Sequence, residues 1–224
     1  MFTGIATRYD LANHALSGGL DWWWRRQAAK VVRRWSPRDV LDLATGSGDL
    51  ALTIQAACPA ATVVGADFCE AMLVQARRKG LSPAVLADAL DLPFANGTFD
   101  VVTVAFGLRN MSSWSRALEE MARVLRPRGH CLILDFSLPA QPLRWLYRPY
   151  LHVVLPRVAG WLTGKPDAYT YLGASIEQFP SGPAMCALLA EAGFAEPAFR
   201  RLSGGIVTLY TASRPSLGAS PAAC

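Results

Sequence analysis

Several signals are missing from this 224-residue sequence, and each absence excludes a class of protein. No apolar run reaches the roughly 18 to 20 residues that a membrane-spanning helix needs. Residues 1–20 lack the apolar core of a signal peptide. There is no C-x-x-C pair, no zinc-ligand spacing, no aromatic RNA-binding segment and no long basic run. We therefore expect no membrane span, no metal site and no nucleic-acid partner.

The composition is that of an ordinary globular protein. Hydrophobic residues make up 52% and charged residues 17% of the chain, which favours a substantial core over disorder. This length suits one domain, expected over residues 1–212, with a disordered tail over residues 213–224. The five cysteines are odd in number and scattered, which indicates reduced thiols and a cytoplasmic protein.

The net charge of +5 favours contact with an anionic surface. Because nothing indicates nucleic acid, an anionic membrane is the remaining candidate. The candidate contacts are residues 144–157 and the run from Trp22 to Arg26, whose three tryptophans cannot all face one side of a helix. The membrane hypothesis implies peripheral contact at the inner membrane face; the alternative is that the tryptophans pack into the core.

One glycine-containing stretch organises the rest of the sequence. Residues 40–50, VLDLATGSGDL, form a short apolar strand, a turn and the start of a helix. Gly46 and Gly48 lack a Cβ, so the turn can approach a nucleotide-like ligand while the helix offers free N–H groups. The pattern also fits a dinucleotide enzyme. Asp42 and Asp49 favour the sulfonium cofactor S-adenosylmethionine (SAM), because two carboxylates would repel a pyrophosphate.

Apolar strands alternate with helical segments around this turn. Helices are expected over much of residues 2–35, after Gly48, over 69–79, after the capping serines 112 and 113, and over 183–192. The aromatic, proline-rich segment 138–180 is expected to form a helical lid over the substrate. The alternation predicts an α/β fold with a doubly wound parallel sheet and ligands at the strands' carboxyl ends. The expected strands are 40–43, 61–66, 84–87, 99–105, 131–136, 197–202 and 205–212.

Several longer motifs are spread along the chain. They are FxxxAxxYDxxN at 2–13, DLATGSGD at 42–49, FGLRN at 106–110, RVLRP at 123–127, LPR at 155–157, YxYLxxSI at 169–176 and FP at 179–180. In these motifs the chain resembles the ubiquinone/menaquinone biosynthesis C-methyltransferases, which are class I SAM-dependent methyltransferases. The resemblance implies a Rossmann-like seven-stranded sheet with N-terminal helices and a helical lid inserted after strand five. It also implies SAM as the cofactor and methylation of a ring carbon of a demethylmenaquinol or a related ubiquinol precursor.

The resemblance assigns residues to the cofactor. Asp67 ends the second strand, where the family's ribose-binding acid stands, and Ser47 replaces a cofactor-contacting threonine. Ala105 stands where members often carry a serine, and Arg128 replaces a common glycine. Tyr9 would cover the cofactor, and the pair at 88 and 89 would lie beside the adenine. The expected cofactor residues are Tyr9, Asp42, Gly46, Ser47, Gly48, Asp67, Phe68, Asp88 and Ala89.

Arg109 and Asn110 are the expected catalytic residues. The ring carbon of the hydroquinone can attack the methyl group of SAM only if an adjacent ring hydroxyl is nearly ionised. A phenolic pKa near 10 leaves roughly one part in a thousand of that hydroxyl ionised at pH 7. A cation at Arg109 would lower that pKa, and Asn110 would donate to the developing oxyanion. The alternative for Arg109 is a surface ion pair. His152 can take the ring proton or pack in the core, and Asp135 can contact the substrate or cap strand five.

Other functions stay open at this point. A natural-product methyltransferase on the same scaffold would prefer a soluble polycyclic phenol. A SAM-binding module without turnover would be indifferent to a change at Arg109, and a dinucleotide enzyme would bind NADH. The first hypothesis implies a prenylated hydroquinone substrate, and a homodimer is its expected assembly.

Overall fold

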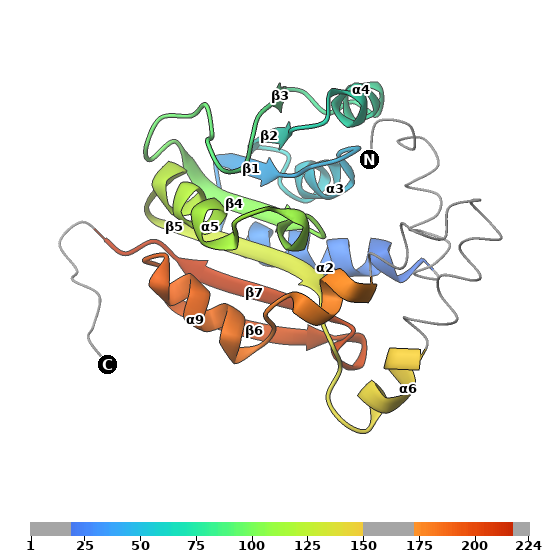
Figure 1. The fold of residues 1–224 in the computed structure, drawn as a ribbon. Coiled ribbons are helices and arrows are strands. Elements are labelled where there is room, and N and C mark those ends of the chain that lie inside the picture. Colours follow the sequence, from blue (N-terminus) through green and yellow to red (C-terminus); the bar gives the residue numbers. More distant parts are fainter. Residues whose placement is uncertain (1–18, 150–172, 217–224) are drawn as a thin grey trace.

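The computed structural model describes residues 19–149 and 173–216, which form a seven-stranded sheet between layers of helices (Figure 1). The strand order is β3-β2-β1-β4-β5-β7-β6, with β1 to β5 parallel and β7 antiparallel to both of its neighbours. The strands are β1 Asp39–Leu43, β2 Thr62–Asp67, β3 Ala84–Leu86, β4 Phe99–Ala105, β5 Leu125–Phe136, β6 Ala195–Leu202 and β7 Val207–Ser213.

Several helices begin next to a glycine, a proline or a capping serine. Gly48, at φ 88°, precedes α3, and Pro183 opens α9. Ser113 Oγ accepts a hydrogen bond from the backbone N–H of Arg116 and so caps α5, as expected. The helices are α2 Leu20–Arg34, α3 Asp49–Ala57, α4 Glu70–Arg78, α5 Trp114–Val124, α6 Leu143–Pro149 and α9 Pro183–Glu191, with short 3-10 turns η1 Leu108–Asn110 and η3 Ser203–Gly205.

The sheet is buried on both faces. Val102 and Val104 of β4 pack into a core with α5 and α9, whereas Val101 faces a second core with α2 and α3. Ile133 and Leu132 divide the neighbouring β5 between the two cores in the same way. Successive side chains of a strand point to opposite faces, so continuous apolar runs are what a sheet covered on both sides requires.

Three expectations need correction. The sheet is not wholly parallel, because β6 and β7 are joined through the short turn η3 and therefore pair antiparallel. Strand β5 begins at Leu125 rather than Cys131, since Leu125 pairs with Phe99 as soon as α5 ends. Ser213 is the last residue of β7, and the backbone of Arg214 still pairs with the turn at 128–129, so order extends into the segment expected to be disordered.

Other expectations fall outside the described residues. Most of the proposed lid lies in residues 150–172, including His152, and only residues 138–149 and 173–180 of it are described. Tyr9 lies in residues 1–18, so its expected contact with the cofactor is not described either. Within the described part of the chain, no helix is long and apolar enough to cross a membrane.

The three tryptophans of α2 divide between core and surface. Trp24 is buried, with its indole N–H donating to Ser203 Oγ at 2.9 Å. Trp22 and Trp23 are 55% and 41% exposed. The helix starts after Gly19, at φ 78°, so only one face of this run can reach the sheet. The prediction that at least one tryptophan leaves the core is confirmed.

Candidate active site

A strained turn joins β1 to α3 at the carboxyl end of the sheet. Ala44, Gly46 and Gly48 all have positive φ values, of 51°, 56° and 88°. Such values cost little for glycine and more for alanine, so the turn stores some strain at Ala44. Its conformation is fixed from outside by two carboxylates, those of Asp42 and Asp67.

Asp67 connects the ends of β1 and β2. Its Oδ2 accepts from the backbone N–H of Gly46 at 2.8 Å, and its Oδ1 accepts from the N–H of Cys69 at 2.9 Å. Burial raises the pKa of this carboxyl group, and the backbone donors partly offset the effect. A carboxylate has about four acceptor sites, so Asp67 can also accept from a hydroxyl group of a ligand.

Asp42 lies beneath the turn. It is buried, and its two oxygens accept from Thr45 Oγ1 at 2.6 Å and Thr103 Oγ1 at 2.7 Å. Burial raises its pKa to about 6, although both hydroxyls favour the charged form. The side chain thus organises the turn from below.

Ser47 faces a cluster of charges at the start of α3. Lys79 Nζ lies 2.8 Å from both Ser47 Oγ and Asp49 Oδ1. Arg25 Nη2 lies 3.8 Å from the other oxygen of Asp49, and the same guanidinium pairs with Asp21. A carboxylate in the first turn of a helix also interacts favourably with the helix dipole. The cluster therefore holds the first turn of α3 against α2 and α4.

The residues expected beside the adenine lie at the ends of β2 and β3. The backbone N–H of Ala87 donates to the carbonyl of Asp67 at 3.0 Å, which connects the two strand ends. Asp88 is exposed, and its Oδ1 accepts from the N–H of Leu90 at 2.9 Å. Phe68 is 69% exposed, so its ring is available to a flat ligand.

Arg109 and Asp135 form a buried ion pair at the ends of β4 and β5. Arg109 Nη1 lies 2.6 Å from Asp135 Oδ1, and the arginine is 7% and the aspartate 0% exposed. The same Nη1 donates to the carbonyl of Phe106 at 2.6 Å. Burial raises the pKa of Asp135 despite the adjacent guanidinium. Arg109 Nε is buried without a hydrogen-bond partner among the described residues.

Aromatic rings surround this ion pair. Phe106 and Phe136 lie with centroids 4.8 Å apart, and Trp24 is about equidistant from them, at 6.1 and 6.0 Å. The guanidinium of Arg109 lies 5.1 Å from the Phe136 centroid. Asn110 Nδ2 is 3.4 Å from the carbonyl of Phe106, a long contact. The arrangement offers an apolar wall with one buried donor.

The charges around the turn suit a cationic ligand. Asp42 and Asp67 are both buried, and desolvation opposes the charge of each. A nearby sulfonium or ammonium lowers that cost, whereas a pyrophosphate would increase it. A carboxylate acceptor in the position of Asp67 suits the ribose of either class of nucleotide, so this acceptor does not distinguish the two ligands.

Comparison with known families decides between these ligands. The model of the ubiE/COQ5 methyltransferase family matches residues 1–214. The chain belongs to this family. It is therefore a SAM-dependent methyltransferase, and this membership supports SAM over a dinucleotide and an enzyme over a binding module.

Two curated relatives of this ubiE/COQ5 methyltransferase carry the same name. The chain is 46% identical over 221 residues to the demethylmenaquinone methyltransferase of Thermus thermophilus, covering 96% of this chain and 100% of the relative. It is 43% identical over 217 residues to the enzyme of the same name from Mycolicibacterium gilvum, covering 96% and 93%.

Solved structures confirm the fold of the family member. A SAM-dependent methyltransferase from Thermotoga maritima superposes with a TM-score of 0.66 at 18% identity, over 95% of this chain and 98% of that one. Another, from Aquifex aeolicus, gives 0.58 at 20% identity, over 82% and 87%. The expected Rossmann-like, seven-stranded class I sheet is thus confirmed.

Sequence reasoning missed the residues that support the turn from other elements. Thr103 interrupts an apolar strand, and a hydroxyl in a buried strand could have indicated a polar partner. Lys79 and Arg25 gave no such signal, because their partners depend on how α2 and α4 pack. Phe106 was noted only as part of a motif.

Proposed function

We propose that this methyltransferase transfers a methyl group from SAM to a ring carbon of a demethylmenaquinol or a related ubiquinol precursor, a prenylated hydroquinone. The observation that carries the proposal is the buried Nε of Arg109, which lies beside aromatic rings and has no hydrogen-bond partner in residues 19–149 and 173–216. A donor in such a place suits a ring oxygen of an apolar substrate. The common name of the curated relatives supports the same substrate class.

The proposed role of Arg109 depends on its partner. SAM, when bound, supplies an electrophilic methyl group on a sulfonium. Asp135 balances the charge of the guanidinium, so Arg109 would act through a directed hydrogen bond from Nε rather than through net charge. That bond would stabilise negative charge on the ring oxygen ortho to the attacking carbon, with Asn110 as a second donor. Neither role needs a metal ion.

The proposed cofactor contacts follow from the same geometry. The free lone pairs of Asp67 would accept the ribose hydroxyls, and Gly46 and Gly48 would let the backbone approach the ligand. Ser47 accepts from Lys79 and keeps its hydroxyl proton for the ligand. The remaining proposed contacts are Asp88, Ala89, Phe68 and Tyr9 at the adenine and cover, with Asp42 supporting the turn.

Methyl transfer from labelled SAM tests the substrate. Wild-type protein should methylate a short-chain demethylmenaquinol or a demethylated ubiquinol precursor, and the preferred one names the nucleus. Arg109→Lys should lower kcat by roughly 10² to 10³ while SAM still binds. Arg126→Lys is the matched control, because Arg126 pairs with Asp39 and Asp100 by Nη1, at 2.8 and 2.7 Å, and is half-exposed.

The alternative enzyme predicts the opposite preference. Methylation of a soluble polycyclic phenol, with neither quinol accepted, would replace the quinol proposal by a natural-product methyltransferase. Equal activity of the Arg109→Lys and Arg126→Lys variants would remove Arg109 from the catalytic machinery.

Peripheral contact with an anionic membrane is the second part of the proposal, since a prenylated substrate resides in the bilayer. Trp22 and Trp23 are exposed, and the guanidinium of Arg26 lies 4.0 Å from the Trp22 centroid. Trp145 of α6 is 76% exposed. Tryptophan with arginine is typical of membrane interfaces.

Flotation with liposomes tests this contact. Wild-type protein should float with anionic vesicles in a salt-sensitive way, and a Trp22→Ser, Trp23→Ser variant should float less. Phe199→Ser, at an exposed aromatic on the edge strand β6, is the control. Equal flotation of the wild type, the double tryptophan variant and the Phe199→Ser control would contradict the membrane proposal. A cytoplasmic location, a homodimer and the absence of a nucleic-acid partner stay predictions.

A further inference from the structure

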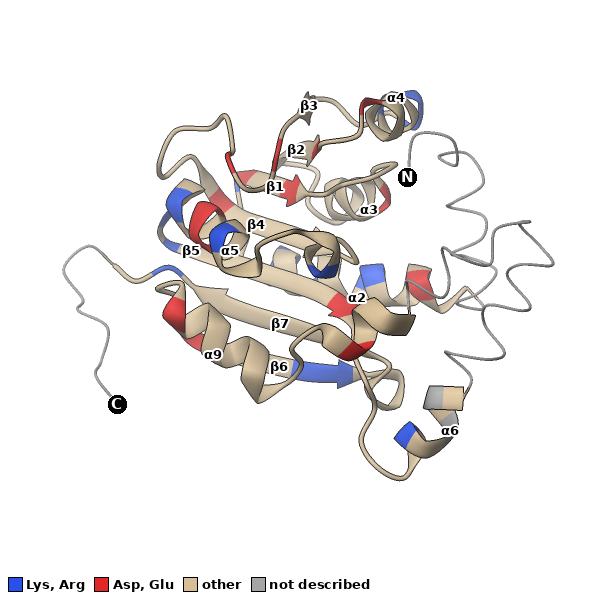
Figure 2. Cartoon of the chain, in the orientation of Figure 1, with Lys and Arg blue, Asp and Glu red and all other residues tan. Residues whose placement is uncertain are grey.

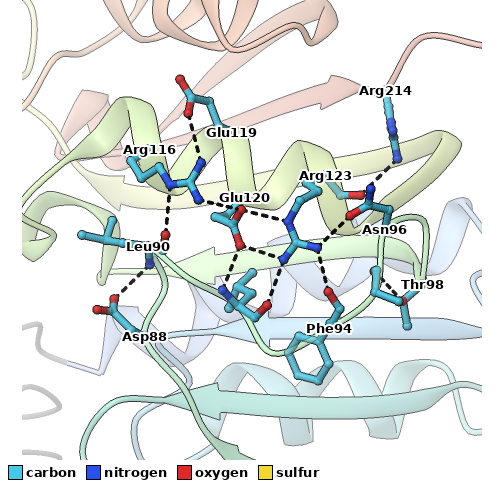
Figure 3. A network of polar contacts seen from close by, with 12 residues as sticks. Asp88, Leu90, Phe94, Asn96, Thr98, Arg116, Glu119, Glu120, Arg123 and Arg214 are labelled. Carbon is cyan, nitrogen blue, oxygen red and sulfur yellow. Dashed lines mark hydrogen bonds and ion pairs between the residues drawn. The ribbon is translucent and has the colours of Figure 1, made fainter.

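The loop between β3 and β4 carries Asp88 and Ala89 but has little regular structure. Its sheet-like contact within the described residues is an isolated bridge between Asp88 and Asp91. Without a strand ladder, the polar backbone groups of such a loop need side chains or water as partners. Figure 3 shows that these side chains come from α5, where acidic and basic residues lie close together (Figure 2).

Glu120 and Arg123 hold the middle of the loop. The backbone N–H of Leu92 donates to Glu120 Oε2 at 2.8 Å, and Arg123 Nη2 donates to the carbonyl of Leu92 at 2.9 Å. Arg123 Nη1 also donates to the carbonyl of Phe94 at 2.7 Å. Both hydrogen-bonding groups of Leu92 are thus bound by a single helix.

Arg116 holds the end of the loop nearest the proposed adenine site. Its Nε donates to the carbonyl of Leu90 at 3.1 Å, and the N–H of Leu90 donates to Asp88 Oδ1 at 2.9 Å. That N–H is the one hydrogen-bond donor to the carboxylate of Asp88 in the described part of the chain. The orientation of the Asp88 carboxylate therefore depends on the backbone that Arg116 holds.

Glu120 fixes the positions of both arginines. It is 2% exposed and accepts from Arg123 at 2.9 and 2.7 Å, with Arg116 Nη2 at 3.2 Å. The hydrogen bond from Arg123 is the main reason why the pKa of Glu120 is lowered. A buried carboxylate shared by two guanidinium groups orders them more than a solvated partner would. Arg116 is thus held in place although its side chain is 50% exposed.

We propose that Arg116, held by Glu120, is a positioning residue for the adenine end of the cofactor site. It acts through the backbone of Leu90 on Asp88, whose carboxylate accepts a hydrogen bond from the exocyclic amine of adenine. The inference rests on the proposed function, because it takes Asp88 as the acceptor. It extends that function by placing a determinant of nucleobase specificity on α5, outside the cofactor motifs.

A purely structural network would give a different result. In that case, removing Arg116 would lower stability and leave the choice of nucleobase unchanged. Arg126 provides the matched control: it also pairs with two carboxylates, and its side chain is 39% exposed against 50% for Arg116. Arg116→Ala and Arg126→Ala should therefore cost similar, small amounts of stability.

The test compares two ligands by calorimetry. The purine-riboside analogue of S-adenosylhomocysteine carries a hydrogen in place of the exocyclic amine and keeps ring N1 as an acceptor. Wild-type protein should prefer the adenosyl form by about tenfold or more, because the amine donates to a carboxylate. Arg116→Ala should reduce this preference by about fivefold, whereas Arg126→Ala should keep it.

A double variant shows whether Arg116 acts through Asp88. Asp88→Ala should lose the preference, and adding Arg116→Ala should change it no further. An unchanged preference in Arg116→Ala, beside a discriminating wild type, overturns the proposal alone. Wild-type protein that binds neither nucleoside overturns the proposed cofactor site and this inference with it.

Discussion

Gly107 lies so close to Ala44 that a Cβ on Gly107 would be 2.6 Å from the Cβ of Ala44. The loops that follow β1 and β4 thus touch at a point where no side chain fits. One loop belongs to the proposed cofactor site and the other leads to Arg109. Their contact sets the spacing between the two halves of the site.

Gly107→Ala should therefore lower the free energy of unfolding by about 1–3 kcal/mol, the cost of overpacking. Ala44→Gly should rescue it, because it removes the opposing methyl group and relieves the positive φ of 51° at Ala44. Urea unfolding of both single variants and the double variant measures the coupling. Simple additivity of the two changes would show that the loops adjust independently.

Asp135→Asn should destabilise the protein by about 3–5 kcal/mol, because it leaves the buried guanidinium of Arg109 without a countercharge. Asp39→Asn is the control, since its partner Arg126 is half-exposed and the pair should contribute less than about 1 kcal/mol. Equilibrium unfolding in urea distinguishes them. Equal losses would mean that Arg109 finds another partner or reaches water.

Asp42 should make stability fall as the pH rises. Its pKa is about 6 in the folded protein and about 3.9 in an unfolded chain. Between these values the folded state binds more protons, so its contribution to the free energy of unfolding declines by about 2 kcal/mol from pH 4 to pH 6. Measured from pH 4 to 7, the profile of Asp42→Asn should lack this decline.

The comparison of profiles isolates Asp42 from other groups. Asp67 and Asp135 also have raised pKa values and add a slope of the same sign, while Asp100 and Glu120 have lowered ones. Asp91→Asn, at an exposed carboxylate, serves as the control. A parallel profile for Asp42→Asn would contradict the assignment.

Arg128→Gly should stabilise the protein by about 1 kcal/mol. Arg128 has a φ of 63°, which glycine adopts without strain. The hydrogen bond from the Arg128 N–H to the carbonyl of Arg214, at 2.9 Å, would be kept. Lys30→Gly, at an exposed site inside α2, should instead cost about 1 kcal/mol. Thermal unfolding measures the sign of the change in stability for both variants. A loss of stability in Arg128→Gly would show that the backbone at Arg128 is not strained.

The strands were predictable because burial on both faces demands continuous apolar runs. Residues 99–105 form β4 with the expected bounds, and Ser113 caps α5 as expected. The reversed direction of β7 was not deduced from the residues, because an apolar run does not reveal which way a strand pairs. It depends on how η3 folds the chain back.

The site was predictable in its backbone and less so in its partners. The glycine turn and Asp67 follow from a strand that ends in a known pattern. The partner of Arg109 was not predicted, because Asp135 lies 26 residues away and meets it only where β4 and β5 pair side by side. Neither expectation for Arg109 anticipated a buried ion pair, since burial emerges from packing.

Because β7 runs opposite to β5, Ser213 pairs with His130 near the amino end of the parallel strands, remote from the glycine turn. The backbone of Arg214 then closes on Gly129 at 2.8 Å. A fluorophore, surface tether or fusion partner joined beyond Ser216 would consequently report on the enzyme, or immobilise it, from the end opposite the one at which substrate and cofactor are proposed to meet. The carboxyl-terminal side of the chain is therefore the suitable attachment point for labels and tethers in activity assays.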